Sequence, residues 1–131
     1  MEPFAHTLRI YWEDTDAAGV VFYANYLKFF ERARTEWLRA LGVGQHILRE
    51  QSGAVLVVTD TRVRFRRPAR LDDELIVTVR LRRASRATML IDQQALRARE
   101  LLAEGEIRIA CVDAGTFKPR RIPSSVCALL A

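Results

Sequence analysis

The sequence of residues 21–42 reads VFYANYLKFFERARTEWLRALG, and its apolar side chains recur every three or four positions. This spacing is typical of one face of an α-helix of about five turns. The recurring residues are Phe22, Tyr26, Phe29, Phe30, Ala33, Trp37 and Leu41. Gly42 follows at once, where a left-handed helix C-cap is expected. A long helix with so wide an aromatic stripe needs a large apolar surface to cover it.

The segments on either side of this helix supply that surface. Residues 6–12 alternate as a strand does, with Leu8, Ile10 and Trp12 on one side. After a short irregular or helical piece over residues 44–53, strand-like runs follow without another helix. We place these runs at residues 54–66, 74–83, 87–97 and 101–113, with turns at 67–73 and 82–86. The order predicts an α+β fold in which an antiparallel sheet curls around a single helix.

The length and composition limit the class of protein. A chain of 131 residues is expected to form one domain over residues 1–131, because two cores would each be smaller than usual. With 50% hydrophobic and 28% charged residues, the composition excludes a disordered chain, and no apolar run is long enough for a membrane span. The N-terminus shows no secretory signal and the cysteines are Cys111 and Cys127 alone, so we expect a cytoplasmic protein with reduced thiols.

The net charge of +5 comes mainly from arginine, and nine arginines fall between Arg62 and Arg86. Because a guanidinium matches the oxygens of a phosphate group, this cluster suits a phosphorylated ligand. It also suits nucleic acid, or a solvated face of the sheet. Nucleic acid fits least, because the aromatic residues gather on the predicted helix and do not alternate with the arginines.

Several kinds of site have no support in the sequence. The two histidines, His6 and His46, and the two cysteines are too far apart in the chain to predict a metal site. We find neither a GxGxxG nor a Walker motif, so no cofactor is expected, and Ser124 and Ser125 lie in a tail without a GxSxG motif. Cys111 falls on the inward side of a predicted strand and is interpreted as a core residue.

Three acidic residues, Glu13, Asp14 and Asp16, precede a small-residue turn that opens into the helix. One interpretation makes Asp14 or Asp16 an acid that caps the helix. Asp16, however, lies several residues before the helical pattern begins, where its carboxylate would face free N–H groups of the first turn. Such N–H groups also bind oxyanions, and a nucleophile or base beside an oxyanion site is what acyl transfer requires. Both interpretations stay open at this point.

Four motifs carry a resemblance to a known family: DTDAAGVV at residues 14–21, ANYLKFFERARTEWLR at 24–39, RPARLDDEL at 67–75 and KPRRIP at 118–123. With them the chain resembles the hotdog-fold acyl-CoA thioesterases of the 4-hydroxybenzoyl-CoA thioesterase family, particularly the bacterial branch associated with the Tol–Pal gene cluster. The resemblance implies a hotdog fold, in which a five- or six-stranded antiparallel sheet wraps one long helix. It also implies a homodimer or homotetramer with active sites at the dimer interface.

The resemblance assigns roles to residues of the first motif. Asp16 matches the catalytic aspartate of the family, and Gly19 matches a glycine that lets the turn approach the substrate. Tyr23 matches the first helical position, whose backbone N–H polarises the thioester carbonyl. The nearest branch usually carries histidine at the position of Tyr23, whereas tyrosine resembles the hydroxybenzoyl-specific branch. A histidine-dependent mechanism is therefore not expected, and Tyr23 favours an aromatic or short acyl group.

The implied reaction is hydrolysis of an acyl-CoA thioester to a free acid and CoA, without a metal or another cofactor. A thiol with a pKa of about 8.5 is a good leaving group, so a strong general acid is not essential. Asp16 either attacks the thioester carbonyl or acts as a general base toward water. Because a carboxylate is a weak base at neutral pH, we favour the nucleophile.

Basic residues around the turn after the third strand meet the CoA phosphates in relatives. The matching candidates for substrate binding here are Arg82, Arg83, Ser85 and Arg86. Arg120 and Arg121 in the tail are weaker candidates of the same kind.

Thr59 and Thr61 interrupt an apolar strand that is expected to face the helix. They line the acyl pocket or, as we prefer, are β-branched core residues. The sequence does not decide between CoA and acyl carrier protein as the thiol carrier.

Two other functions stay open. A non-catalytic module that binds an acyl carrier or an envelope complex would keep the fold without turnover. Dehydration of a hydroxyacyl thioester, another reaction of this fold, usually pairs a histidine with an acid, and neither His6 nor His46 lies in a suitable motif.

Overall fold

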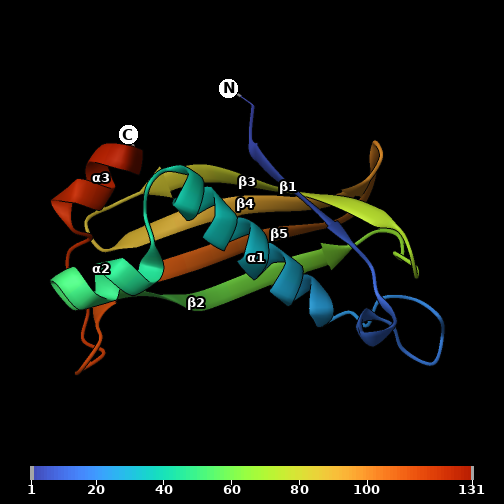
Figure 1. The fold of residues 1–131 in the computed structure, drawn as a ribbon, viewed down its shortest axis with the longest axis horizontal. Helices are drawn as coiled ribbons and strands as arrows, with labels where there is room; N and C mark the ends of the chain where they lie inside the picture. The colour runs from blue at the N-terminus through green and yellow to red at the C-terminus, as the bar shows by residue number, and fades with distance from the viewer. Residues whose placement is uncertain (1, 131) are drawn as a thin grey trace.

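A computed structural model describes residues 2–130, and its elements follow one another along the chain as coloured in Figure 1. A short strand, β1 (Phe4–Arg9), and a 3₁₀ turn, η1 (Trp12–Asp14), come first. Two helices follow, α1 (Asn25–Ala40) and α2 (Gln45–Ser52). The remaining elements are β2 (Ala54–Phe65), β3 (Glu74–Ala84), β4 (Thr88–Arg97), β5 (Glu100–Asp113) and α3 (Ser124–Leu130).

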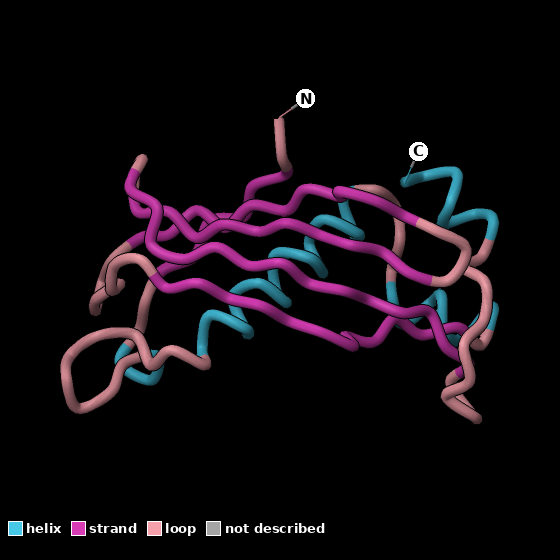
Figure 2. Tube along the Cα trace, turned by 180° about the vertical axis from the view of Figure 1, so that it is seen from behind, coloured by secondary structure: helices cyan, strands magenta, loops and turns pink. Residues whose placement is uncertain are grey.

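The five strands form one sheet in the order β1-β3-β4-β5-β2, and every neighbouring pair is antiparallel. α1 crosses one face of the sheet at a slant, and the view from behind in Figure 2 has the sheet in front of this helix. The core lies between them, where Phe29, Phe30 and Ala33 of α1 are fully buried. The predicted α+β fold, one long helix against an antiparallel sheet of five strands, is therefore confirmed.

α1 begins at Asn25, four residues later than the periodicity predicts. Val21 forms an isolated β-bridge with Thr15 and donates its N–H to the carbonyl oxygen of Ala69 at 2.8 Å. A residue in this extended pairing does not have the helical backbone conformation, so the helix begins only after it. Tyr23 therefore lies in the turn before α1, and its expected place as the first helical residue is wrong.

The first strand is also shorter than predicted. β1 ends at Arg9, and Trp12 lies in η1 with 78% of its side chain exposed, so it does not belong to the inner face of a strand. The chain leaves the sheet here because the N–H groups of Asp14 and Thr15 bond back to the carbonyl oxygens of Tyr11 and Trp12. The structure also contains two shorter helices. α2 confirms the helical option for residues 44–53, whereas α3 was not expected from the sequence.

Thr59 and Thr61 are exposed, so the preferred core interpretation is wrong for both. The pairing of β2 with β5 shifts register between Val58 and Asp60. Such a bulge inserts one extra residue and changes which side chains point inward. The Thr59 hydroxyl donates to the carbonyl oxygen of Arg108 at 3.4 Å across this bulge.

The Phe30 ring of α1 packs tightly against Gly105 of β5. A Cβ atom on this residue would lie 2.9 Å from Cε2 of Phe30, a distance that real Cβ atoms essentially never show. Phe30 is fully buried and has no room to withdraw. Beside it, Nε2 of Gln93 on β4 donates to the Phe30 carbonyl oxygen at 3.0 Å, which fixes the helix over the sheet.

The close approach at Gly105 predicts the effect of adding a single methyl group there. Gly105→Ala is expected to lower the free energy of unfolding by about 1–3 kcal/mol, because overpacking forces the Phe30 ring or the helix to shift. Urea unfolding followed by circular dichroism measures this change. Gly44→Ala is the matched control, since a Cβ there meets the Ile47 side chain at no less than 3.7 Å. Equal unfolding midpoints for the two variants would show that the contact does not limit the packing.

Candidate functional site

The chain folds back on itself between Asp14 and Phe22 to form the loop that carries the predicted catalytic acid, here called the acid loop (residues 14–22). The N–H of Phe22 donates to the carbonyl oxygen of Asp14 at 3.0 Å, and the N–H of Asp16 donates to that of Val20 at 3.0 Å. Val20 also forms a β-bridge with Arg70, four residues before β3 begins. The acid loop therefore lies at the end of the sheet where β3 starts (Figure 1).

Asp14 and Asp16 have different surroundings although they are two residues apart. Asp14 is buried, and its Oδ2 accepts the N–H of Tyr11 at 2.8 Å. Asp16 is exposed, and its Oδ1 accepts the N–H of Ala18 at 2.9 Å inside the same loop. The N-cap residue of α1 is Ala24, without a capping side chain, so helix capping by either acid is wrong. Asp14 holds the loop together, whereas the Asp16 carboxylate is accessible to a ligand.

The turn before α1 leaves two backbone donors free. The N–H of Asn25 donates to the Phe22 carbonyl oxygen at 2.8 Å, and the N–H of Tyr26 donates to that of Tyr23 at 3.3 Å. Within residues 2–130, the N–H groups of Tyr23 and Ala24 donate no hydrogen bond. Free N–H groups at a helix start are suited to an oxyanion. Tyr23 therefore stays a candidate for the donor although it precedes the helix.

Exposed aromatic side chains surround the acid loop. Tyr23 is 64% exposed. The centre of its ring lies 4.9 Å from that of Phe22, and 6.0 Å, edge-on, from that of Phe65 at the end of β2. Tyr11 and Trp12, which precede the acid loop in the sequence, are also exposed. A monomer rarely leaves so much aromatic surface in water, so this region is typical of a binding or subunit surface.

Gly19 closes the acid loop with a backbone torsion φ of +79°, and its N–H donates to the Asp16 carbonyl oxygen at 2.9 Å. A Cβ on this residue would meet no atom within 4 Å. The glycine is therefore needed for its left-handed backbone and not for space within the chain.

The candidate phosphate-binding residues lie at the opposite end of the sheet from the acid loop. Arg83 is near the end of β3, and Ser85 and Arg86 follow in the turn to β4. Since β3 contains 11 residues, a strand rise of about 3.3 Å per residue separates its two ends by roughly 33 Å. One chain therefore does not bring Asp16 together with these residues.

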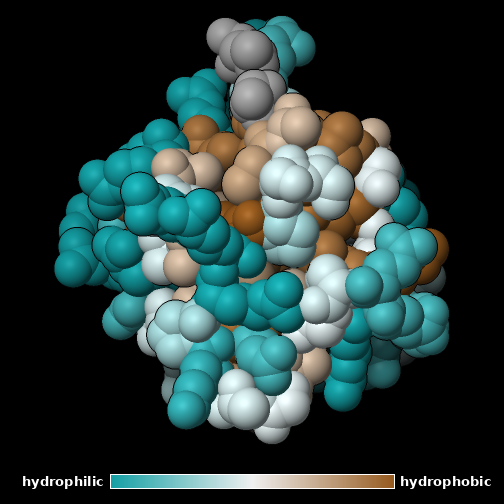
Figure 3. All heavy atoms as spheres, turned by 90° about the vertical axis from the view of Figure 1, so that its left-hand side faces the viewer, coloured by the Kyte–Doolittle hydropathy of each residue, from teal (hydrophilic) through white to brown (hydrophobic). Residues whose placement is uncertain are grey.

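The tail is attached to this same end. The N–H of Ile122 donates to the carbonyl oxygen of Arg86 at 2.8 Å, which places Arg121 beside the turn. Arg120 points elsewhere, since it donates to the Ser52 carbonyl oxygen at 2.8 Å. Figure 3 views this end of the molecule, where hydrophilic side chains gather on the left and hydrophobic ones on the upper right.

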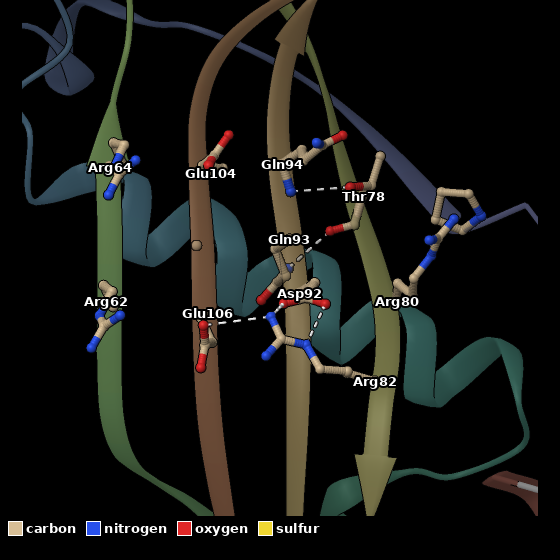
Figure 4. A pocket seen from close by; sticks show the side chains of 12 residues that line it. Arg62, Arg64, Thr78, Arg80, Arg82, Asp92, Gln93, Gln94, Glu104 and Glu106 are labelled. Carbon is tan, nitrogen blue, oxygen red and sulfur yellow. Dashed lines mark hydrogen bonds and ion pairs between the residues drawn. The ribbon is translucent and has the colours of Figure 1, made fainter.

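Arg82 lies apart from the other candidates, in a groove of about 500 Å³ across the outer face of the sheet (Figure 4). Its Nε donates to Oδ2 of Asp92 at 2.8 Å, and its Nη2 lies 3.4 Å from Oε2 of Glu106. These two carboxylates raise the pKa of the Arg82 guanidinium. Arg82 and Arg83 are both in β3, so their predicted place in the turn is wrong. The charge of Arg82 is already paired with the two carboxylates. Neither Asp16 nor Tyr23 lines this groove.

A second, smaller cavity of about 150 Å³ lies between α1 and the β2 side of the sheet, and it was not predicted from the sequence. Its walls come from α1, α2, β2, β4 and β5, and Arg34 is among them. Packing between elements that are far apart in the sequence creates this space, so no local motif predicts it. Helical periodicity places Arg34 on the polar face, yet the structure buries it.

Two further observations bear on the class of site. Over the described residues, no group of three or more His, Cys, Asp and Glu side chains is arranged to hold a metal ion. Within the same range, no helix is both long enough and apolar enough to cross a membrane.

Comparison with known proteins places this geometry in a family. Residues 10–130 match the thioesterase-like superfamily. The chain is 42% identical over 123 residues to the acyl-CoA thioesterase YbgC of Haemophilus influenzae, covering 94% of this chain and 90% of that protein. It is 40% identical over 126 residues to the acyl-CoA thioester hydrolase YbgC of Escherichia coli O6:H1, covering 95% and 93%.

Solved structures agree with this match. A probable thioesterase from Bartonella henselae superposes with a TM-score of 0.88 at 35% identity, covering 93% of this chain and 100% of that one. The fold and these relatives define a thioester hydrolase built on the hotdog fold. The chain belongs to the thioesterase-like superfamily.

The different surroundings of the two aspartates predict different effects on stability. Asp14→Ala is expected to lower the free energy of unfolding by about 1–3 kcal/mol, because it leaves the Tyr11 N–H without its acceptor. Asp16→Ala is expected to change it by less than about 0.5 kcal/mol, as for an ordinary surface position. Thermal and urea unfolding of both variants check this. A larger loss for Asp16→Ala than for Asp14→Ala would contradict the structural role given to Asp14.

Proposed function

We propose that this protein is an acyl-CoA thioesterase that hydrolyses an acyl-CoA thioester to a free acid and CoA at the acid loop. The observation that carries the proposal is the exposed carboxylate of Asp16, in a loop that runs into the two free N–H groups of Tyr23 and Ala24. Relatives named acyl-CoA thioesterase support CoA as the carrier, with acyl carrier protein as the alternative. The proposal treats residues 1–131 as one cytoplasmic catalytic domain of the Tol–Pal-associated branch, acting without a cofactor.

The chemistry assigns a role to each group. A carboxylate oxygen of Asp16 attacks the thioester carbonyl carbon, and the carbonyl oxygen becomes an oxyanion that accepts hydrogen bonds from the N–H groups of Tyr23 and Ala24. The C–S bond then breaks, CoA leaves as the thiolate, and a mixed anhydride on Asp16 is hydrolysed by water. As a general base, Asp16 would instead take a proton from the attacking water. One oxyanion donor is worth roughly 3 kcal/mol, so the turn before α1 contributes a large part of the rate.

A second copy of the chain completes the site in this proposal. β2 is an edge strand, and its apolar residues 55–57 are half-buried while Val58 is 47% exposed. A long edge strand with apolar side chains favours pairing with another strand. Antiparallel pairing of two β2 strands around a twofold axis sets the Phe65 end of one copy beside the Ala54 end of the other.

This pairing brings the two ends of the sheet together across the interface. The acid loop of one copy, next to Phe65, then lies near Arg83 at the end of β3 of the other copy and near Ser85 and Arg86 in the turn that follows. We propose that these residues bind the CoA phosphates from across the interface, and that Arg82 contributes only by ordering the end of β3. Gly19 gives the thioester access to the loop, and Thr59 lies on the shared edge, where it reaches the acyl group. The assembly is a homodimer or a tetramer of two such dimers.

Loss of the Asp16 charge is expected to abolish turnover. Asp16→Asn should lower kcat/KM for thiol release from acyl-CoAs about a hundredfold or more, because the amide is neither a nucleophile nor a base. Glu13→Gln, which removes an exposed acid three residues away, is the matched control and should leave the rate within about twofold. Undiminished turnover by Asp16→Asn would overturn the site. A wild-type protein that binds acyl-CoA without turnover would instead favour the non-catalytic binding module.

A mixing experiment tests whether two copies share one site. Arg83→Ala/Arg86→Ala should raise KM for an acyl-CoA about tenfold or more, and leave KM unchanged for the same acyl N-acetylcysteamine thioester, which has no phosphates. Neither this variant nor Asp16→Asn has an intact site. A mixed dimer, however, combines Asp16 of one copy with both arginines of the other.

Unfolding and refolding the two variants together should therefore restore about a quarter of the wild-type activity at low substrate concentration, since about half the dimers are mixed and each has one intact site. Refolding either variant alone is the control. Recovery no greater than the sum of the two variants would show that each site lies within one chain.

A further inference from the structure

Arg34 is a buried charge without an ion-pair partner. It lies on α1 and is 9% exposed, whereas charged residues are seldom buried unless they are paired. Its Nη1 donates to Oε1 of Gln93 at 2.9 Å, and within residues 2–130 no carboxylate forms an ion pair with it. Because a guanidinium has five N–H donors, most of the hydrogen-bonding capacity of Arg34 is left over.

The free donors of Arg34 reach the small cavity beside α1. This cavity of about 150 Å³ is walled mainly by apolar side chains of Trp37, Leu38, Leu56, Val57, Val58, Met89, Ile91 and Ile109. Among the described residues, no fully buried side-chain nitrogen or oxygen lacks a hydrogen-bond partner. The nitrogens of Arg34 that donate to no protein group therefore contact accessible space, and Arg34 lines this cavity. A pocket of about 150 Å³ has room for a ligand the size of benzene.

The charges around the cavity favour an uncharged ligand. Glu31 lines the same space, one turn before Arg34 on α1, and its Oε1 accepts the Thr35 hydroxyl at 3.1 Å. Burial lowers the pKa of the Arg34 guanidinium and the Glu31 carboxylate opposes that change, so Arg34 stays protonated. A ligand carboxylate would meet repulsion from Glu31 as well as attraction to Arg34. A hydroxyl or carbonyl oxygen avoids this repulsion and still accepts from the guanidinium.

The cavity lies where the acyl group of the proposed substrate would extend. Met89, in its wall, pairs with Ala84 at the turn end of β3, and Val57 and Val58 are on the edge strand β2. With two β2 strands paired antiparallel, this part of one copy faces the acid loop of the other.

We propose that Arg34 determines acyl specificity: the cavity takes an acyl chain of about six carbons, and Arg34 donates to an uncharged oxygen at its far end. This inference rests on the proposed thioesterase function. Arg34 is a specificity residue and takes no part in the bond-breaking step, since it contacts the far end of the acyl chain.

The test compares kcat/KM for 6-hydroxyhexanoyl-CoA and hexanoyl-CoA. The wild type should prefer the hydroxylated substrate about tenfold, because a hydrogen bond from a charged donor replaces one to water. Arg34→Met should abolish this preference, and Arg34→Lys should retain part of it. The ratio is informative because a purely structural loss would lower both rates alike. Arg34→Lys also keeps the test available if Arg34→Met does not fold.

Controls separate this inference from the proposed function. Arg39→Met removes an exposed arginine of the same helix, paired with Glu36, and should leave the ratio unchanged. A ratio near one for the wild type, or the same ratio in Arg34→Met, would overturn the role of Arg34. Turnover of hexanoyl-CoA in the same assay would still support the proposed thioesterase function. A preference for adipoyl-CoA, whose acyl chain ends in a carboxylate, would overturn the claim that Arg34 binds an uncharged oxygen.

If no thioester is turned over, the proposed function fails and a binding measurement decides the role of Arg34. Calorimetry then compares 6-hydroxyhexanoyl-CoA and hexanoyl-CoA on the wild type and on Arg34→Met. Tighter binding of the hydroxylated thioester by the wild type alone supports the role of Arg34, and equal binding overturns it.

Discussion

The packing of α1 on the sheet at Gly105 is the contact on which the other features depend. Only a residue without a side chain lets the Phe30 ring lie against β5, and Gln93 then holds the helix backbone from the neighbouring strand. This fixes both the position and the rotation of the helix. Its first turn is thereby set beside the acid loop, and Arg34, one turn beyond Phe30, is set over the small cavity. The packing of α1 therefore influences the positions of both the acid loop and Arg34.

The sequence predicts the elements that depend on periodicity. The aromatic stripe of residues 21–42 identifies α1, and alternating side chains identify the four long strands, because burial on one face imposes both patterns. The errors fall where contacts with distant parts of the chain override the pattern. Val21 is apolar at helical spacing but its N–H bonds to Ala69, and Thr59 alternates correctly but sits at a bulge.

The candidate site could be predicted only in part for the same reason. Asp16 and Gly19 are recognisable because they belong to one short motif whose residues lie close together in the chain. Neither the burial of Asp14 nor the burial of Arg34 follows from periodic spacing. Asp14 accepts the N–H of Tyr11 within an irregular turn, and Arg34 donates to Gln93 of another element, β4. The predicted position of Arg82 in the turn was also wrong. β3 extends to Ala84, so Arg82 lies in the strand, where its side chain pairs with Asp92 and Glu106.

The acid loop and the arginine-bearing turn lie at opposite ends of one sheet, and this separation explains why the chain alone gives no single obvious active-site cleft. The wide groove that it does possess belongs to the outer face, where side chains of opposite charge neutralise one another. The groups proposed for thioester chemistry are exposed loop atoms, which a neighbouring copy would enclose in the proposed dimer.

The outer face also restricts how copies can stack. Across it, arginines of β3 and β2 (Arg80, Arg82, Arg62 and Arg64) flank acids of β4 and β5 (Asp92, Glu104 and Glu106). A twofold axis along the strands, between β4 and β5, would map arginine onto arginine and acid onto acid. Like charges opposed in this way cost several kcal/mol, so two sheets resist stacking in register. The charges of this face therefore disfavour a stacked pair of copies about that axis.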